Sequence, residues 1–257
     1  MNKAVFVFLI AVCVAIGGFS AFQLINYYSK DRAAEKDFAA LLPVSELPGT
    51  ADIPFDGDLI EYDYLYSYYE ELRQRNGDMV GWLSIPGTRV AYPVMQTKGN
   101  PEYYLDRNFE KEYSAAGSLF ASAISDVELP SDVVTVYGHR MKTGAMFGSL
   151  GDFLSSAFLA EHETIVFDTF AGRGLYRVYA AFTIDVGGDG ADSGFAYYDY
   201  SEFRGEAEFD RFVEQVRGLA ATENPAYRPV YGEKLLLLST CEYSHEDGRL
   251  VIVAVRV

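Results

Sequence analysis

The chain has 257 residues, of which 49% are hydrophobic and 23% are charged, and its formal net charge is −16. This length allows one sizeable domain with appendages, and the hydrophobic content is ample for a packed core. The acidic balance argues against nucleic-acid binding, because phosphate contacts need clustered Lys and Arg. It suits solubility outside a cell or a cationic partner.

The first predicted element is an apolar N-terminal helix. No charged residue occurs between positions 4 and 29, and the apolar core at 4–22 is about the length needed to cross a bilayer. A cleaved signal peptide is the alternative, but its apolar region would be shorter and would end at small residues. We therefore expect residues 1–29 to be an uncleaved, single-pass membrane anchor.

The next elements connect this anchor to a folded domain. Residues 31–42 are typical of a short polar helix or stalk, and the Pro- and Gly-containing stretch 43–57 is typical of a linker. Tyr and Leu at helical spacing over residues 60–75 predict an amphipathic helix packed on the domain. The predicted division is thus an anchor at 1–29, a stalk or linker at 30–59 and a folded domain at 60–257.

Beyond residue 80 the sequence is typical of β-structure, with short apolar runs separated by Gly and Pro. Eight strands in this pattern favour a closed barrel over an open α/β sheet. Two helices are predicted between strands, at 146–158 and at 203–220, and the apolar stripe of the second indicates core packing. The eight predicted strands are 80–85, 90–94, 117–121, 133–137, 164–167, 176–184, 234–239 and 250–257.

Cys241 ends the apolar run 235–238 after two small polar residues, Ser239 and Thr240. The second cysteine, Cys13, lies in the predicted anchor, so a disulfide between the two is not expected. An unpaired cysteine in an exported protein is either a reactive group or a buried bystander. Arg249 follows eight residues later, where a hairpin would bring it beside Cys241, and a nearby cation favours the thiolate.

Among three histidines, His139 alone follows a β-like run, through Gly138, onto a loop. His162 has the surroundings of a solvated loop, and His245 lies in an acidic turn. Spacing alone leaves open whether His139 is catalytic or structural. A thiol, an imidazole and a guanidinium are nevertheless the groups required for nucleophilic acyl transfer.

Other chemistries have little support in the sequence. The dispersed cysteines and histidines lack the ligand spacing of zinc sites, and no glycine-rich phosphate loop opens a helix. We expect no metal and no organic cofactor. Arg256 also falls in the last predicted strand, and its simplest interpretation is a surface charge. The aromatic run 195–200 is predicted either to line a pocket or to lie on the surface.

Five stretches of the sequence together resemble the sortases, and class B sortases in particular. Thr240-Cys241 at the end of a strand with Arg249 shortly after is similar to the sortase cysteine signature, and residues 137–147 resemble the class B histidine motif. The stretches 80–85 and 92–96 are similar to early strands of the family, and 100–105 resembles a segment that contacts the substrate. The resemblance covers roughly residues 60–257, with the helix at 203–220 similar to the class B insertion.

This resemblance implies a mainly β fold, a closed eight-stranded sortase-type barrel with an N-terminal helix and a helix inserted before the cysteine strand. It implies transpeptidation without a cofactor, and no oxygen-ligand motif indicates calcium. Cys241 would attack the carbonyl of a Thr in a C-terminal sorting signal and form a thioacyl enzyme. His139 would transfer protons, and Arg249 would bind the substrate carbonyl or the oxyanion. Substrate contacts are expected from Leu105, Ser239, Thr240 and Glu242.

The partners implied are surface proteins that carry a C-terminal sorting motif and an amine of a peptidoglycan peptide or of its lipid-linked precursor. The enzyme would face the outside of a Gram-positive cell, held at the membrane by its N-terminal helix. Two alternatives stay open. One is a membrane-tethered cysteine protease in which water accepts the acyl group. The other is a non-catalytic surface binding module in which Cys241 is a core residue.

Overall fold

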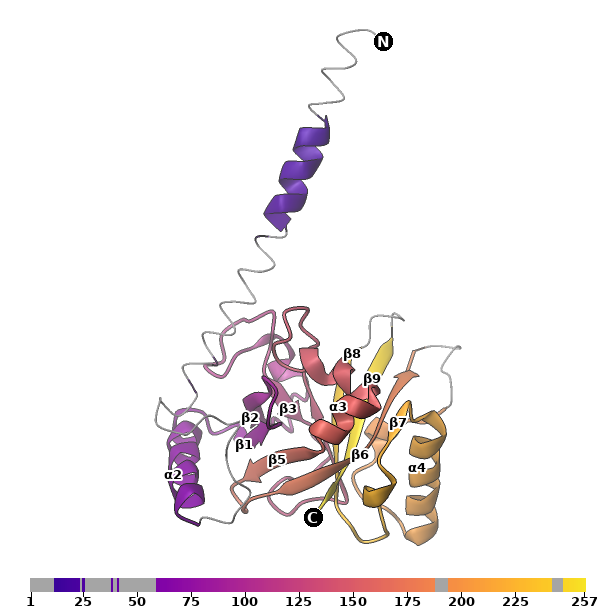
Figure 1. Ribbon diagram of the computed structural model, residues 1–257. Coiled ribbons are helices and arrows are strands. Elements are labelled where there is room, and N and C mark those ends of the chain that lie inside the picture. Colours follow the sequence, from indigo (N-terminus) through magenta and orange to yellow (C-terminus); the bar gives the residue numbers. More distant parts are fainter. Residues whose placement is uncertain are drawn as a thin grey trace.

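The computed structural model describes residues 12–23, 25, 38, 41, 59–187, 194–241 and 247–257 (Figure 1). Residues 12–23 are helical. None of the helices in the described part of the chain combines the length and apolar character that crossing a bilayer requires. Part of the predicted anchor, including residues 1–11, lies outside the described residues.

A closed barrel of eight strands forms the centre of the described structure. Its strands follow one another in the order β5-β1-β2-β3-β4-β8-β9-β6, and pairing between β5 and β6 closes the ring. The β2–β3 and β4–β8 pairs are parallel and the others are antiparallel. The strands are β1 (Met79–Ser84), β2 (Ala91–Met95), β3 (Leu119–Ala121), β4 (Val133–Tyr137), β5 (Thr164–Thr169), β6 (Leu175–Asp185), β8 (Leu235–Cys241) and β9 (Gly248–Arg256).

The predicted barrel is confirmed, and every predicted strand lies within two residues of the observed one at both ends. A ninth, two-residue strand was not predicted: β7 (Thr222–Glu223) pairs with β6 at the edge. A run this short carries no alternating pattern, so sequence periodicity could not reveal it.

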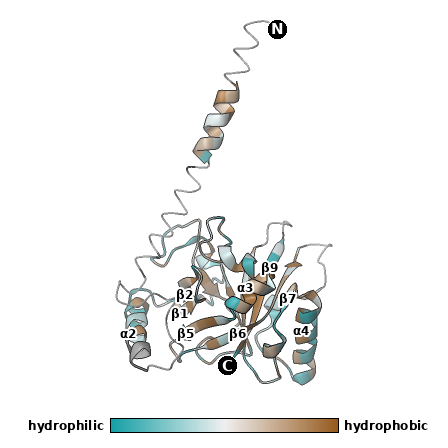
Figure 2. Cartoon of the chain, in the orientation of Figure 1, coloured by the Kyte–Doolittle hydropathy of each residue, from teal (hydrophilic) through white to brown (hydrophobic). Residues whose placement is uncertain are grey.

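Both faces of the sheet are buried around β8 and β9. Leu236 and Leu238 belong to the barrel core, whereas Leu235 and Leu237 belong to a second cluster on the outer face. Alternate residues of a strand point to opposite faces, so a strand covered on both sides has a continuous apolar sequence. This explains the four consecutive leucines. In Figure 2 the strands are largely brown (hydrophobic), whereas much of α4 is teal (hydrophilic).

Helix α4 (Glu206–Leu219) covers the outer face and confirms the predicted apolar stripe. Burial of each large apolar side chain contributes about 1.5–3 kcal/mol, which is enough to hold a short helix on the sheet. The first turn of the helix is joined to the preceding chain by a hydrogen bond of 2.7 Å from the Arg204 amide to the Glu208 carboxylate. The buried residues of its stripe are Phe209, Phe212, Val213 and Val216.

Helix α2 (Leu59–Arg75) lies on the opposite side of the barrel in Figure 1. Leu65, Tyr69 and Leu72 are buried, and the Tyr69 ring stacks on Trp82 of β1 with centroids 5.5 Å apart. The predicted amphipathic helix at 60–75 is therefore confirmed. In the predicted stalk, the described residues Phe38 and Leu41 are buried, and Phe38 packs edge-on against Tyr92.

The helix predicted at 146–158 is wrong as a single element. The chain forms a 3₁₀ helix, η2 (Gly148–Leu154), followed by a short α-helix, α3 (Ser156–Glu161). Ser155 between them has extended backbone (φ −97°, ψ 125°), which interrupts the helical hydrogen bonds. Gly148 also approaches the Met141 carbonyl so closely that a Cβ atom would lie 2.4 Å from it. The extended backbone of Ser155 therefore divides the segment into two short helices.

Candidate active site

Strand register places Cys241 directly opposite Arg249 in the antiparallel β8–β9 pair. Residues opposite one another in such a pair have Cβ atoms about 4.5–5.5 Å apart and point to the same face. Val251, two residues beyond Arg249, belongs to the outer cluster, so both side chains lie on the outer face. The predicted hairpin that places Arg249 alongside Cys241 is confirmed, and Cys241 is exposed.

His139 reaches the same edge of the sheet through the parallel β4–β8 pair. Tyr137 lies opposite Ser239, and the Gly138 amide continues the ladder by donating to the Ser239 carbonyl at 3.2 Å. A Cβ at Gly138 would lie 2.3 Å from the Leu119 side chain, so glycine permits this close packing. The Phe147 amide then donates to the His139 carbonyl at 3.0 Å and closes the loop.

The His139 side chain contacts the main chain of a distant segment. Its Nε2 lies 2.7 Å from the carbonyl oxygen of Leu105, which belongs to the 3₁₀ helix η1 (Tyr103–Asp106). The Leu105 side chain is 42% exposed at the rim of the site. The resemblance of residues 100–105 to a sortase segment selected Leu105 as a substrate contact, but nothing in the sequence indicated the contact between its carbonyl and His139.

A cavity of about 590 Å³ joins these groups. Ligand pockets of this size are typically lined by apolar side chains with a few polar groups that orient the ligand. Tyr197, Tyr198, Ile124 and Val186 also line it, and of these only the two tyrosines fell in a stretch considered for the pocket. Six of the seven predicted site residues line the cavity: Leu105, His139, Ser239, Thr240, Cys241 and Arg249.

The seventh predicted residue, Glu242, lies outside the described residues, as does His245. Ser239 and Thr240 line the cavity but are both buried. Since strand residues alternate, the Thr240 side chain lies on the opposite face from Ser239 and Cys241. The Thr240 hydroxyl is buried without a hydrogen-bond partner among the described residues.

Tyr197 forms the wall behind Ser239. The two hydroxyl groups lie 2.8 Å apart, and both side chains are buried. Burial raises the pKa of Tyr197 to about 12, although the Ser239 hydrogen bond and the Arg249 charge act in the opposite direction. Burial likewise raises the pKa of Tyr137, which faces the same cavity. Both phenols therefore stay neutral at physiological pH and supply hydrogen bonds rather than charge.

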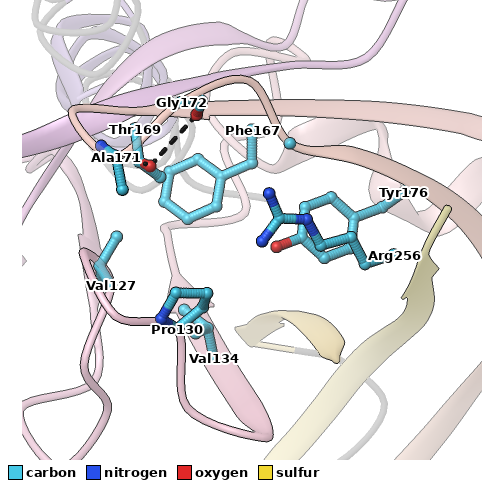
Figure 3. Close-up of a pocket in the computed structure, with 10 residues that line it drawn as sticks. Val127, Pro130, Val134, Phe167, Thr169, Ala171, Gly172, Tyr176 and Arg256 are labelled. Carbon is cyan, nitrogen blue, oxygen red and sulfur yellow. Dashed lines mark hydrogen bonds between the residues drawn. The ribbon is translucent and has the colours of Figure 1, made fainter. Parts of the chain in front are cut away.

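Arg256 lies at the other end of the barrel. Cys241 and Leu235 mark opposite ends of β8, roughly 20 Å apart, and Arg256 follows the partner of Leu235. Figure 3 shows Arg256 with Phe167 and Tyr176 in a cavity of about 20 Å³, room for about one water molecule. The prediction of a surface charge is therefore wrong in part, because this side chain is half-buried.

His162 lies in the bend between α3 and β5, as predicted, but it is half-buried and not fully solvated. Its ring packs on Phe158 with centroids 4.2 Å apart, and Nδ1 lies 3.1 Å from the Pro86 carbonyl. The Gly87 backbone approaches the same ring, so a Cβ there would lie 2.7 Å from it. His162 therefore joins the β1–β2 turn to α3, and among the described residues His139 is the histidine that lines the cavity.

The arrangement brings an exposed thiol, an imidazole and a guanidinium to one cavity, the set that covalent acyl transfer requires. Among the described residues, no group of three His, Cys, Asp or Glu side chains could hold a metal ion. Proton transfer, nucleophilic attack and charge stabilisation can all be supplied by side chains at this edge.

Comparison with known proteins gives a consistent result. Residues 83–257 match the sortase domain family. Sortase B of Listeria monocytogenes is 33% identical over 188 residues, which cover 71% of each chain. The Staphylococcus aureus sortase B–substrate complex superposes with a TM-score of 0.66 at 25% identity, covering 77% of this chain and 95% of that one. A structure of sortase B complexed with triglycine gives a TM-score of 0.66 at 26% identity, covering 77% and 96%. The chain therefore belongs to the sortase family, and within it to the class B enzymes, which are cysteine transpeptidases.

Proposed function

We propose that the chain cleaves a C-terminal sorting signal after a Thr residue and joins the protein to an amine of the cell wall. Cys241 is the nucleophile, His139 the general acid and base, and Arg249 the group that binds the reacting carbonyl. The observation that carries this proposal is the pairing of Cys241 with Arg249 at the cavity that also contains His139.

In the first half of the reaction, the Cys241 thiolate attacks the Thr carbonyl and forms a C–S bond. The carbonyl oxygen gains negative charge, which the Arg249 guanidinium stabilises by donating hydrogen bonds. Protonated His139 transfers a proton to the leaving amine as the C–N bond breaks. The products are a thioacyl enzyme and the released C-terminal tail.

In the second half, an incoming amine attacks the thioacyl carbonyl and forms a new C–N bond. His139 accepts the amine's proton, and the C–S bond breaks to restore the thiolate. The acceptor is an amine of a peptidoglycan peptide or of a lipid-linked precursor. The relative solved with triglycine supports an amine acceptor, because that peptide carries a free amine.

The sorting signal occupies the cavity beside Cys241. Leu105 contributes exposed apolar surface at the rim, and Ser239 and Thr240 line the cavity next to the nucleophile. Glu242, the residue after the nucleophile, is proposed as a further substrate contact. Tyr197 and Tyr198 extend the apolar wall. The solved substrate complex of the S. aureus relative supports this use of the cavity. The partners are therefore surface proteins that carry the sorting motif.

Residues 1–29 anchor the enzyme in the membrane as a single-pass segment, residues 30–59 form the stalk or linker, and 60–257 form the extracellular catalytic domain. The support for the anchor is the uncharged stretch between positions 4 and 29. Tethering places the enzyme where exported substrates and wall precursors meet, which raises their effective concentration.

The test uses the full chain in detergent micelles with a panel of labelled sorting-signal peptides, with and without triglycine, followed by mass spectrometry. We expect an adduct on Cys241 and a ligated product that depends on the amine. Cys241→Ala should abolish both, and His139→Ala and Arg249→Ala should reduce turnover by at least about 100-fold. Arg256→Ala is the matched control, because it removes an arginine from the same strand at the other end of the barrel.

Hydrolysis that triglycine does not alter would instead indicate a membrane-tethered protease. An inert thiol, with no adduct from any peptide, would indicate a binding module. Equal losses in Arg249→Ala and Arg256→Ala would contradict the proposed role of Arg249.

A further inference from the structure

The contact between His139 and Leu105 determines which ring nitrogen is free. A main-chain carbonyl only accepts hydrogen bonds, so Nε2 must carry a proton and donate to it across 2.7 Å. A neutral imidazole has one N–H, and fixing it at Nε2 leaves the lone pair on Nδ1. The group that accepts a hydrogen bond from one ring nitrogen of a histidine generally fixes its tautomer and ring orientation. The Leu105 carbonyl has this effect on His139.

The position of this carbonyl depends on Tyr104, not on the half-exposed Leu105 side chain. Tyr104 is fully buried, and its hydroxyl donates to Asp78 Oδ2 at 2.9 Å and accepts from Asn76 Nδ2 at 2.8 Å. Its own carbonyl accepts from the Ser118 amide at 2.9 Å. Tyr104 is therefore held at its ring, its hydroxyl and its main chain, directly before the carbonyl that faces His139.

Gly117 provides the space that this carbonyl occupies. It has φ +58°, and a Cβ there would lie 2.4 Å from the Leu105 oxygen and 2.7 Å from the Tyr104 oxygen. Any side chain at position 117 must displace η1, in addition to the strain of a left-handed conformation. A buried anchor on one side and a glycine on the other thus fix the position of the Leu105 oxygen.

We infer that the Leu105 carbonyl is the orienting partner of His139, that Tyr104 is the positioning residue that holds it, and that Nδ1 exchanges protons in the reaction. Neutral Nδ1 accepts the proton of the incoming amine, and Nδ1–H donates it to the leaving amine. Nε2–H stays bonded to the carbonyl in both steps. The inference rests on the proposed catalytic role of His139, and it adds residues outside the cysteine and histidine motifs.

The first test does not require activity. The full chain in micelles is labelled with ¹⁵N-histidine, and the nitrogen resonances of His139 are assigned by their loss in His139→Ala. We expect a single Nε2–H tautomer for neutral His139 in the wild type. In Gly117→Ala, whose new Cβ displaces the Leu105 oxygen, we expect the averaged tautomers of a free imidazole. A His139 that is Nδ1–H in the wild type, or that already averages, would overturn the inference.

The second test separates positioning from stability. Tyr104→Phe keeps the ring but removes the hydroxyl that bonds Asn76 and Asp78. Tyr179→Phe is the matched control, because Tyr179 of β6 is also fully buried and its hydroxyl donates to Glu223 of β7 at 3.1 Å. Both variants should lose similar thermal stability.

Only Tyr104→Phe should lower kcat, by roughly ten- to hundred-fold with KM little changed, as expected for a misplaced catalytic group. It should also show averaged His139 tautomers, whereas Tyr179→Phe should not. Equal kcat in the two variants, or an unaltered His139 tautomer in Tyr104→Phe, would assign Tyr104 a structural role only. Absence of activity in the wild type would contradict the proposed function and leave the tautomer result to decide this inference.

Discussion

Replacement of Asp168 by Asn should stabilise the protein at neutral pH. Asp168 lies on β5, opposite Trp82 in the β1–β5 pair, and its side chain is almost fully buried. Burial raises its pKa to about 6, because the nearby Arg173 and the Gly174 amide only partly offset the loss of water. The Arg173 Nε lies 3.8 Å from Oδ1, beyond hydrogen-bond distance.

The sign of the effect follows from the two states. In the unfolded chain this carboxyl titrates at its usual 3.8, so near pH 7 folding must bury a charge that unfolding would return to water. Below its unfolded pKa, Asp168 is neutral in both states and its burial costs no charge desolvation. This advantage is lost as the pH rises through the folded pKa, where the buried carboxyl becomes charged. A pKa moved from 3.8 to about 6 corresponds to about 3 kcal/mol at neutral pH.

Asn has nearly the same shape as the neutral carboxyl and removes this cost. Urea unfolding of wild type and Asp168→Asn should therefore show a stability gain of about 1 kcal/mol near pH 4.5 that rises to about 3 kcal/mol near pH 7.5. Arg173 is one-third exposed, so it can regain water when its carboxylate neighbour is removed.

Asp132→Asn is the control with the opposite sign. Burial opposes its charge, but the Phe203 amide and Lys234 bind the carboxylate and hold the pKa of Asp132 below its usual value. Its replacement should destabilise the protein at neutral pH, with the effect disappearing as pH falls. If Asp168→Asn were less stable than wild type near pH 7.5, attraction to Arg173 would outweigh desolvation, and the reasoning would be refuted.

Three further predictions concern packing and the cavity wall. Tyr197→Phe and Ser239→Ala should each cost about 1 kcal/mol of unfolding free energy, and a double-mutant cycle should show that the losses are not additive, since both remove one 2.8 Å hydrogen bond. Phe212→Ala should cost about 3–5 kcal/mol in the same assay, and a loss below about 1 kcal/mol would contradict the packing of α4 on the sheet. Phe38→Ala should also lower the thermal midpoint, because its ring packs on Tyr92; an unchanged midpoint would mean that this contact adds nothing.

The barrel could be predicted because local patterns carry most of the information about its strands. Each strand is a short apolar run bounded by turn residues, and the continuous leucines of β8 fit the burial of this strand on both faces. The two parts that failed had local causes of another kind. A single helix was predicted over 146–158, but the extended backbone of Ser155 divides it, and β7 is too short to have a period.

The site shows a different limit. Cysteine and histidine are rare in this chain, so residue type and order made Cys241, His139 and Arg249 candidates, and the resemblance to sortases gave them their roles. Their orienting partners could not be identified in this way. The Leu105 oxygen is a main-chain atom that every residue possesses, and its position depends on Tyr104, Asn76 and Asp78, which no motif marks.

Cys241 and Arg249, eight residues apart, form a cross-strand pair because of the hairpin's register. In the β8–β9 pair, residue numbers opposite one another sum to a constant, so Leu238 faces Ile252 and Cys241 faces Arg249. A slip of one residue would place Gly248 or Leu250 opposite the thiol and turn the guanidinium toward the barrel core. Such a slip would also exchange the residues of two buried faces, which the packing of α4 and of the core opposes. The same packing that stabilises the barrel therefore determines which residue faces the thiol. His139, in contrast, is brought to the same edge of the sheet by the parallel β4–β8 pair, which no local turn specifies.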